Sequence, residues 1–187
     1  NFGTTVDYAN PSTPLEISGV LYANIANTRN VVALDATSGQ VLWLYRYDEG
    51  DRYDEAPRKG PGRGVAFYSK GDKQRVIDIS PGYQMVSLDA ETGIPDPEFG
   101  KNGIVDLYQG LRNADDPRYP YPDIGISAPP FVMNDVIVVG AAHRTGGRPR
   151  SKFNTKGDIR GFDVHSGELL WTFHTIPEAG EYGYESW

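Results

Sequence analysis

The sequence has no cysteine, and it holds only two methionines and three tryptophans among 187 residues. Without cysteine the chain forms no disulfide and no thiolate metal site, and this absence fits either redox compartment. No apolar run approaches the roughly 18 residues that a membrane-spanning helix needs. No secretory signal is visible, and the chain begins with Asn1 rather than Met. We therefore expect a processed chain or a fragment.

Positive charge is also scarce. The chain has 18 Lys and Arg against 25 Asp and Glu, a formal net charge of −7. This balance argues against a general nucleic-acid binder and against docking on an anionic membrane. The three histidines, at positions 143, 165 and 174, lack the spacing of a zinc site. Neither a G-x-S-x-G motif nor a phosphate-binding loop is present.

Turn-forming and aromatic residues are abundant. The chain contains 22 Gly and 14 Pro, with 12 Tyr and 7 Phe. Glycine and proline favour turns, and aromatic residues favour strands over helices. Hydrophobic residues make up 39%, which is ordinary for a globular protein with a real core. The composition therefore predicts an all-β fold with many turns.

One phrase occurs three times. It reads VVALDATSGQVLW at 31–43, MVSLDAETGIPDP at 85–97 and IRGFDVHSGELLW at 159–171. In each copy an Asp is followed four residues later by a Gly, and the first and third copies place Trp43 and Trp171 four residues after that Gly. The three Asp residues lie 54 and 74 residues apart. Periods of this size indicate a repeat architecture.

The phrase predicts a β-hairpin. An Asp side chain can accept hydrogen bonds from the backbone that follows it, and a Gly can take the left-handed conformation that ends the turn. The Trp on the outgoing strand is a large apolar body whose indole N–H needs a partner. A single copy cannot bury that surface, whereas a second copy stacked on it can.

Further strand-like runs precede each hairpin, so each unit reads as about four antiparallel strands, a propeller blade. We predict blades at about 11–47, 62–99 and 127–176, forming one partial propeller domain over 1–187. A β-sandwich with coincidental Asp–Gly turns is the weaker alternative. Three blades cannot close a ring, so we expect part of a larger propeller, and an isolated copy that is unstable or self-associating.

The motif Ala33-x-Asp35-x-x-Ser38-Gly39-x-x-x-Trp43 and its third copy resemble the tryptophan-docking motif of quinoprotein dehydrogenases, which use pyrroloquinoline quinone (PQQ). The resemblance extends outside the repeat and is collinear over essentially the whole chain. It includes GRGVAFY at 62–68, FGKNGIVDLYQGL at 99–111 and the stretch that begins ISAPPFVMNDVIVVGAAH at 126. The 99–111 segment is similar to the glucose-dehydrogenase-like branch.

The resemblance implies an eight-bladed propeller that holds PQQ near its axis with a Ca²⁺ ion. Such enzymes oxidise alcohols or sugars in the periplasm and pass electrons to a cytochrome c or to ubiquinone. This chain would be the N-terminal part, supplying one wall of the cofactor site, and would be inactive alone. The alternative is a non-enzymatic propeller scaffold for protein–protein interaction in the bacterial envelope, because fold alone does not separate the two.

Two residues are the first candidates for cofactor contacts. Arg63 matches the family's cofactor-contacting Arg, and a planar guanidinium can grip a carboxylate of PQQ in bidentate fashion. Without the resemblance it would read as a surface Arg in a basic loop. Ser127 matches a position whose hydroxyl binds the cofactor, since a hydroxyl both donates and accepts. The alternative for Ser127 is an ordinary residue at the start of a strand.

Ala142 and His143 match by position the segment that lies against the PQQ ring in the family, and Arg144 follows them in a locally basic loop. His143 would bind the cofactor or fill the base of a loop, and Arg144 suits an anionic cofactor or a solvated loop. Several family members carry a Ca²⁺ ligand where this chain has Arg144 and Thr145, and an Arg repels Ca²⁺. Either later blades hold the metal or this loop is arranged differently. The resemblance implies that the catalytic Asp and the Asn and Asp metal ligands lie downstream of Trp187, so we assign no catalytic residue here and leave the metal ligands open.

Overall fold

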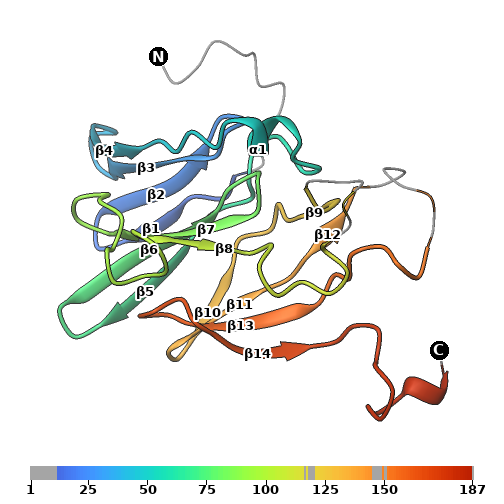
Figure 1. The fold of residues 1–187 in the computed structure, drawn as a ribbon. Helices are drawn as coiled ribbons and strands as arrows, with labels where there is room; N and C mark the ends of the chain where they lie inside the picture. Colours follow the sequence, from blue (N-terminus) through green and yellow to red (C-terminus); the bar gives the residue numbers. More distant parts are fainter. Residues whose placement is uncertain (1–11, 116, 118–120, 145–148, 150, 187) are drawn as a thin grey trace.

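The computed structural model describes residues 12–115, 117, 121–144, 149 and 151–186. These residues form three four-stranded antiparallel sheets and one two-stranded ribbon (Figure 1). The first sheet has the strand order β1-β2-β3-β4. Its strands are β1 (Leu15–Ile17), β2 (Val20–Ile25), β3 (Asn30–Asp35) and β4 (Val41–Tyr45).

The other sheets follow in chain order. The second contains β5 (Ala66–Lys70), β6 (Lys73–Ile79), β7 (Gln84–Asp89) and β8 (Ile104–Asp106). The third contains β10 (Phe131–Met133), β11 (Val136–Val139), β13 (Ile159–Asp163) and β14 (Leu169–Phe173). The ribbon pairs β9 (Ile124–Gly125) with β12 (Ala142–His143). Two single-turn helices complete the fold, α1 (Asp51–Asp54) and the 3₁₀ turn Tyr184–Ser186.

The three sheets lie side by side and fan outward in chain order, from blue through green to orange in Figure 1. The first strands of the second and third sheets adjoin, since β10 contacts β5. This is the arrangement of propeller blades, so the predicted all-β propeller of four-stranded blades is confirmed. No helix among the described residues has the length and hydrophobicity to cross a membrane.

The hydrophobic core occupies the two spaces between the sheets. One cluster joins the first and second sheets and includes Tyr22, Val31 and Leu88. A larger cluster joins the second and third sheets and includes Ile77 and Phe162. Each sheet therefore buries its face against the next one, which is how repeats that lack a core of their own become stable.

The Asp of each repeat forms the predicted turn. In the first copy, Asp35 Oδ1 accepts hydrogen bonds from the backbone N–H of Ser38 at 2.7 Å and of Thr37 at 3.1 Å. The Ser38 hydroxyl also donates to this oxygen, and these Ser38 hydrogen bonds hold the pKa of Asp35 below its usual value. Gly39 ends the turn with a φ of 72°. The same pattern repeats around Asp89 and Asp163.

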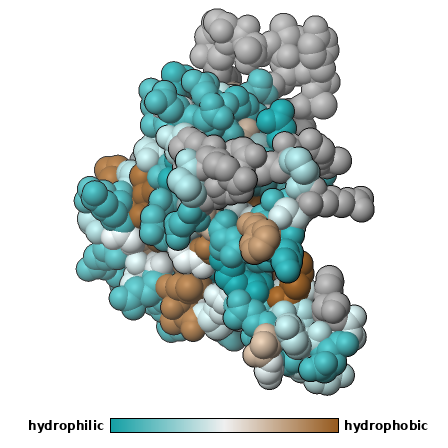
Figure 2. Space-filling view, turned by 45° about the vertical axis from the view of Figure 1, so that its right-hand side comes forward, coloured by the Kyte–Doolittle hydropathy of each residue, from teal (hydrophilic) through white to brown (hydrophobic). Residues whose placement is uncertain are grey.

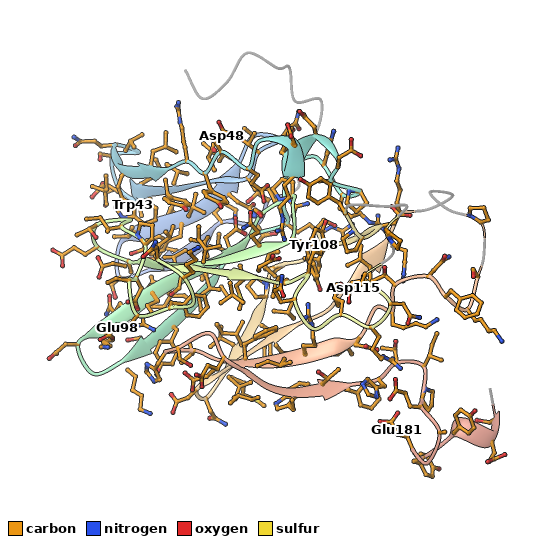
Figure 3. All side chains as sticks on the ribbon, in the orientation of Figure 1. Trp43, Asp48, Glu98, Tyr108, Asp115 and Glu181 are labelled. Carbon is orange, nitrogen blue, oxygen red and sulfur yellow. The ribbon has the colours of Figure 1, made fainter. Side chains whose placement is uncertain are left out.

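Trp43 docks the first sheet on the second. Its Nε1 donates to the carbonyl of Ala90 at 3.0 Å. Its ring covers Gly93, where an added Cβ would lie 2.6 Å from the ring. Figure 3 labels Trp43 between the first sheet and the loop that joins β7 to β8. The glycine that ends one turn therefore also makes room for the tryptophan of the preceding blade.

The second copy departs from the predicted hairpin. Its outgoing segment contains Pro95 and Pro97, which cannot donate ladder hydrogen bonds, and only an isolated bridge joins Leu88 to Pro95. The fourth strand of this sheet is β8, so the sheet ends at Asp106 and not near the predicted limit at residue 99. Residue 11, where the first blade was predicted to begin, lies outside the described residues.

Other groups take the place of the missing tryptophan at the second junction. Arg75 Nη1 donates to the carbonyl of Val164 at 2.8 Å. Val164 follows the Asp of the third repeat just as Ala90 follows the Asp of the second, so the two carbonyls occupy equivalent positions. The Arg75 guanidinium is itself ion-paired with Asp96. The fully buried Phe99 lies against Gly167, where an added Cβ would be 3.2 Å from its ring. The Arg75 hydrogen bond and a phenyl ring thus join the second and third sheets, and the ion pair with Asp96 holds Arg75 within the second.

The outer face of the third sheet is open. Trp171 covers Gly161 of its own sheet and is 41% exposed, and Phe131, Met133 and Phe173 are more exposed still. Strand register places these four side chains on one face. Figure 2 shows brown hydrophobic patches on a mostly hydrophilic surface. Exposed apolar faces of this kind are typical of interaction surfaces or of sites of self-association.

This open face leads to a prediction for the chain on its own. Residues 1–187, expressed alone, are expected to self-associate or to unfold without a sharp transition, because the face that includes Trp171 stays in water. Sedimentation and denaturant unfolding would measure both properties. A monomer with one cooperative transition would contradict the prediction. The variant Trp171→Ser should reduce the self-association.

Candidate functional site

The segments that lead into the first strands of the three sheets meet at one place. The backbone N–H of Thr13, just before β1, donates to the carbonyl of Arg63 at 3.1 Å. The N–H of Arg63, just before β5, donates to the carbonyl of Ser127 at 2.9 Å. Ser127 precedes β10. Two hydrogen bonds therefore join all three sheets at their inner strands, and Arg63 takes part in both.

The backbone around Arg63 requires glycine on both sides. A Cβ added to Gly62 would lie 2.1 Å from the Asn24 side-chain nitrogen. Gly64 has a φ of 137°, and an added Cβ would lie 2.9 Å from the carbonyl oxygen of Thr13. Other residues rarely adopt that φ and could not fit in that space. The sequence GRG thus forms a tight turn that fills the space between neighbouring segments.

The Arg63 side chain points outward from this rigid turn. It is exposed, and its guanidinium has no hydrogen-bond or ion-pair partner among the described residues. Ser127 is half-buried, and its hydroxyl has no hydrogen-bond partner within that same part of the chain. Their main chains are in direct contact. A charged donor and a hydroxyl are therefore held together with their bonding capacity unused, as an anionic ligand would require.

A buried polar cluster lies beneath the turn. The Asn24 side-chain nitrogen donates to the carbonyl of Gly64 at 3.0 Å and to Asp78 Oδ1 at 3.2 Å. The Ser12 hydroxyl donates to Asn24 Oδ1 at 2.8 Å. Asn24 is 1% exposed and Asp78 is 3% exposed. The cluster links β2 of the first sheet and β6 of the second to the turn that carries Arg63.

Asp78 is a buried carboxyl beside a buried guanidinium. Burial raises its pKa to about 7, although the charge of Arg29 acts in the opposite direction. Arg29 lies at the β2–β3 turn and is 4% exposed. Its guanidinium donates to four backbone carbonyls, those of Arg58, Gly60, Ile79 and Ile126. One side chain therefore connects the first sheet to the second and to both segments that precede β5 and β10.

Strand pairing brings the predicted residues 142–144 close to Ser127. Ala142 pairs with Gly125 and His143 pairs with Ile124, so β12 lies beside β9 (Figure 1). Gly125 is two residues before Ser127. The fold thus brings the segment 142–144 to the same region as Arg63 and Ser127.

The His143 ring has a specific partner within its own loop. Its Nε2 donates to the carbonyl of Thr155 across 2.7 Å. The His143 carbonyl in turn accepts a hydrogen bond from Arg58. The ring borders an open depression of about 440 Å³ between β12 and the segment 151–157. This contact agrees with the reading in which His143 fills the base of a loop.

Arg144 is exposed and has no partner among the described residues. Thr145, the other position at which a Ca²⁺ ligand is absent from the family pattern, lies outside the described residues. Within the part of the chain that the structure describes, no three His, Asp or Glu side chains come together as a metal site. The site thus presents positive charge and hydroxyl groups.

The buried cluster was not identified from the sequence. The available signal was Asp78, an acid within the apolar run RVIDIS at 75–80. A buried charge is costly unless it is paired or hydrogen-bonded, so an acid in such a strand indicates a specific partner. Its partners Asn24 and Arg29 come from another sheet, and nothing in their local sequence marks them.

Comparison with known proteins identifies the family to which the chain belongs. Residues 3–187 match the model of the PQQ family described as "Glucose/ethanol/alcohol dehydrogenase, beta-propeller domain". The glycerol dehydrogenase large subunit of Gluconobacter thailandicus is 29% identical over 91% of this chain and 23% of that protein. The quinoprotein glucose dehydrogenase of Escherichia coli K12 is 27% identical over 89% of this chain and 21% of that protein.

Solved structures agree on the fold. The quinohemoprotein alcohol dehydrogenase ADHIIG of Pseudomonas putida HK5 aligns with a TM-score of 0.68 and 23% identity, over 99% of this chain and 24% of that one. The chain spans between about a fifth and a quarter of the length of these relatives. By its sequence and its three blades, the chain belongs to the PQQ family of glucose/ethanol/alcohol dehydrogenase β-propeller domains.

Proposed function

We propose that this chain is part of a PQQ-dependent dehydrogenase that oxidises sugars or alcohols, and that it forms one wall of the PQQ site. The observation that carries the proposal is Arg63. Its guanidinium is exposed and unpaired among the described residues, on a turn hydrogen-bonded between the inner segments of three blades. The family match supports PQQ as the cofactor.

The residues present fit an anionic cofactor. Arg63 would bind a carboxylate with two parallel N–H donors and stay charged throughout turnover. The Ser127 hydroxyl would donate to, or accept from, an oxygen beside it. The small side chain of Ala142 would allow a flat ring to approach, while His143 and Arg144 would lie at the margin of the site. Bound PQQ would supply the two-electron acceptor for the substrate.

Other parts of the function belong to the complete protein. We assign the catalytic base and the Ca²⁺ ligands to residues outside this chain. The electron acceptor would be a cytochrome c or ubiquinone, and the location would be periplasmic. The named relatives act on glycerol and glucose, so the substrate class stays a sugar or an alcohol.

The test uses the complete protein with PQQ and Ca²⁺. Titration of PQQ should show saturable binding, and dye reduction should follow on aldoses or primary alcohols. Arg63→Ala should raise the Kd for PQQ about 30-fold, because hydrogen bonds to charged groups contribute about 2 kcal/mol. Arg63→Lys should give a Kd for PQQ between those of the parent and Arg63→Ala, since lysine keeps the charge and loses the two parallel N–H donors.

Lys59→Ala is the matched control. Lys59 is an exposed cation of the same linker, and its replacement by alanine should leave the Kd for PQQ unchanged. A complete protein that binds no PQQ and reduces no dye would overturn the proposal and leave the scaffold function. An equal loss in Lys59→Ala and Arg63→Ala would reduce the role of Arg63 to general positive charge.

A further inference from the structure

We propose that Asn24 and Asp78 are positioning residues, which hold the Gly62–Gly64 turn so that Arg63 faces its ligand. The inference rests on the proposed function of Arg63 and extends it to side chains that do not touch the ligand. Both residues are buried and lie beneath the turn, on β2 and β6. Neither was singled out by the sequence or by the family resemblance.

The turn itself has few other restraints. The N–H and the carbonyl of Arg63 bond to Ser127 and Thr13, which fixes its ends against the neighbouring blades. The carbonyl of Gly64 is held by Asn24. Without that bond, the two glycines that flank Arg63 would allow the turn to move, because glycine has wide conformational freedom. Asn24 is therefore the side chain that holds the turn from below.

The orientation of Asn24 is fully determined by its partners. Its two side-chain hydrogens go to the carbonyl of Gly64 and to Asp78 Oδ1, and its oxygen accepts from Ser12. An amide with both donors and its acceptor engaged cannot rotate without breaking a buried hydrogen bond. Asp78 thus fixes the amide, and the amide fixes the turn.

The surroundings of Asp78 support a specific role. Its neighbours on β6, Val76, Ile77 and Ile79, are buried and apolar. Packing alone would be served by another apolar residue, and burying a carboxylate is costly. Arg29, from the β2–β3 turn, and Glu49, from the β4–α1 connection, are the charged groups that face it. Asn24 is the side chain to which Asp78 is hydrogen-bonded.

The first test needs no cofactor. In the cofactor-free complete protein, hydrogen exchange at the Arg63 amide should accelerate about tenfold in Asn24→Ala and in Asp78→Val. The Asp78→Val variant leaves the buried Arg29 guanidinium without its counter-charge and should be less stable than the parent, so exchange at the Arg63 amide is compared with that of amides in the same variant that exchange only on global unfolding. Trp43→Phe is the control, since it also removes one hydrogen bond between the first two sheets. It should leave the Arg63 amide unchanged.

The second test is a double-mutant cycle on PQQ affinity. Asn24→Ala should raise the Kd about tenfold when Arg63 is present and should have no effect in an Arg63→Ala background. Purely structural damage would act equally in both backgrounds. Additive effects, or unchanged exchange at the Arg63 amide, would overturn the inference. If Arg63→Ala does not change the Kd for PQQ, the proposed function is overturned instead. The exchange measurement needs no PQQ and therefore does not depend on the proposed function.

Discussion

Replacement of Arg29 by methionine is expected to lower the free energy of unfolding by about 4 kcal/mol, the range typical of breaking a buried charge pair. Arg29 is 4% exposed and faces Asp78. Methionine fills similar space but donates nothing. The variant therefore leaves a buried carboxyl without its cation and four carbonyls without their donors.

Denaturant unfolding of the complete protein would measure this loss. Arg46→Met is the matched control, because Arg46 is exposed and has no partner among the described residues. It should change the free energy of unfolding by less than about 0.5 kcal/mol. A loss below about 1 kcal/mol in Arg29→Met would contradict the view that Arg29 holds the three blades together.

Replacement of Asp78 by asparagine is expected to remove a large pH dependence of stability. Burial raises the pKa of Asp78 from 3.8 to about 7, so between these values the folded protein binds a proton that the unfolded chain has released. The stabilisation is complete below about pH 4 and is lost as the pH rises through about 7. A shift of this size corresponds to about 4 kcal/mol.

The measurement compares the two proteins from pH 4 to pH 8. The free energy of unfolding of the parent, relative to Asp78→Asn, should fall by about 4 kcal/mol over this range, with no further change above it. Charges that face Asp78 come from Arg29 and Glu49, and both are retained in the variant. Ile77→Val is the control: it should lower the free energy of unfolding by about 1 kcal/mol at every pH. Parallel pH profiles for the parent and Asp78→Asn would contradict the assignment.

The strands and turns of the fold were predictable because their causes are local. The Asp and Gly of each repeat shape the turn by bonds within five residues, and Asp35 shows the predicted pattern. The docking of Trp43 on the next repeat was also predictable, since an exposed indole requires a partner. The second junction was not, because a hydrogen bond from Arg75 to the Val164 carbonyl takes the place of the tryptophan, and Arg75 lies outside the repeated phrase.

The candidate site likewise contains residues that the sequence pointed to and residues that it did not. Arg63 and Ser127 were selected as candidates by resemblance to a family, and the structure shows that their main chains are hydrogen-bonded. Asn24 and Asp78 were missed, because they are 54 residues apart in the chain and become neighbours only when two blades pack. No local pattern encodes such a pair.

The sequence by itself determined the all-β repeat, the Asp-centred turns and the family. These depend on short-range hydrogen bonds, on the docking of Trp43 against the next repeat, and on motifs that a family shares. Only the tertiary structure decided which polar groups meet beneath Arg63. Their pairing depends on how the blades are rotated against one another, and that rotation is set by packing over the whole interface between sheets.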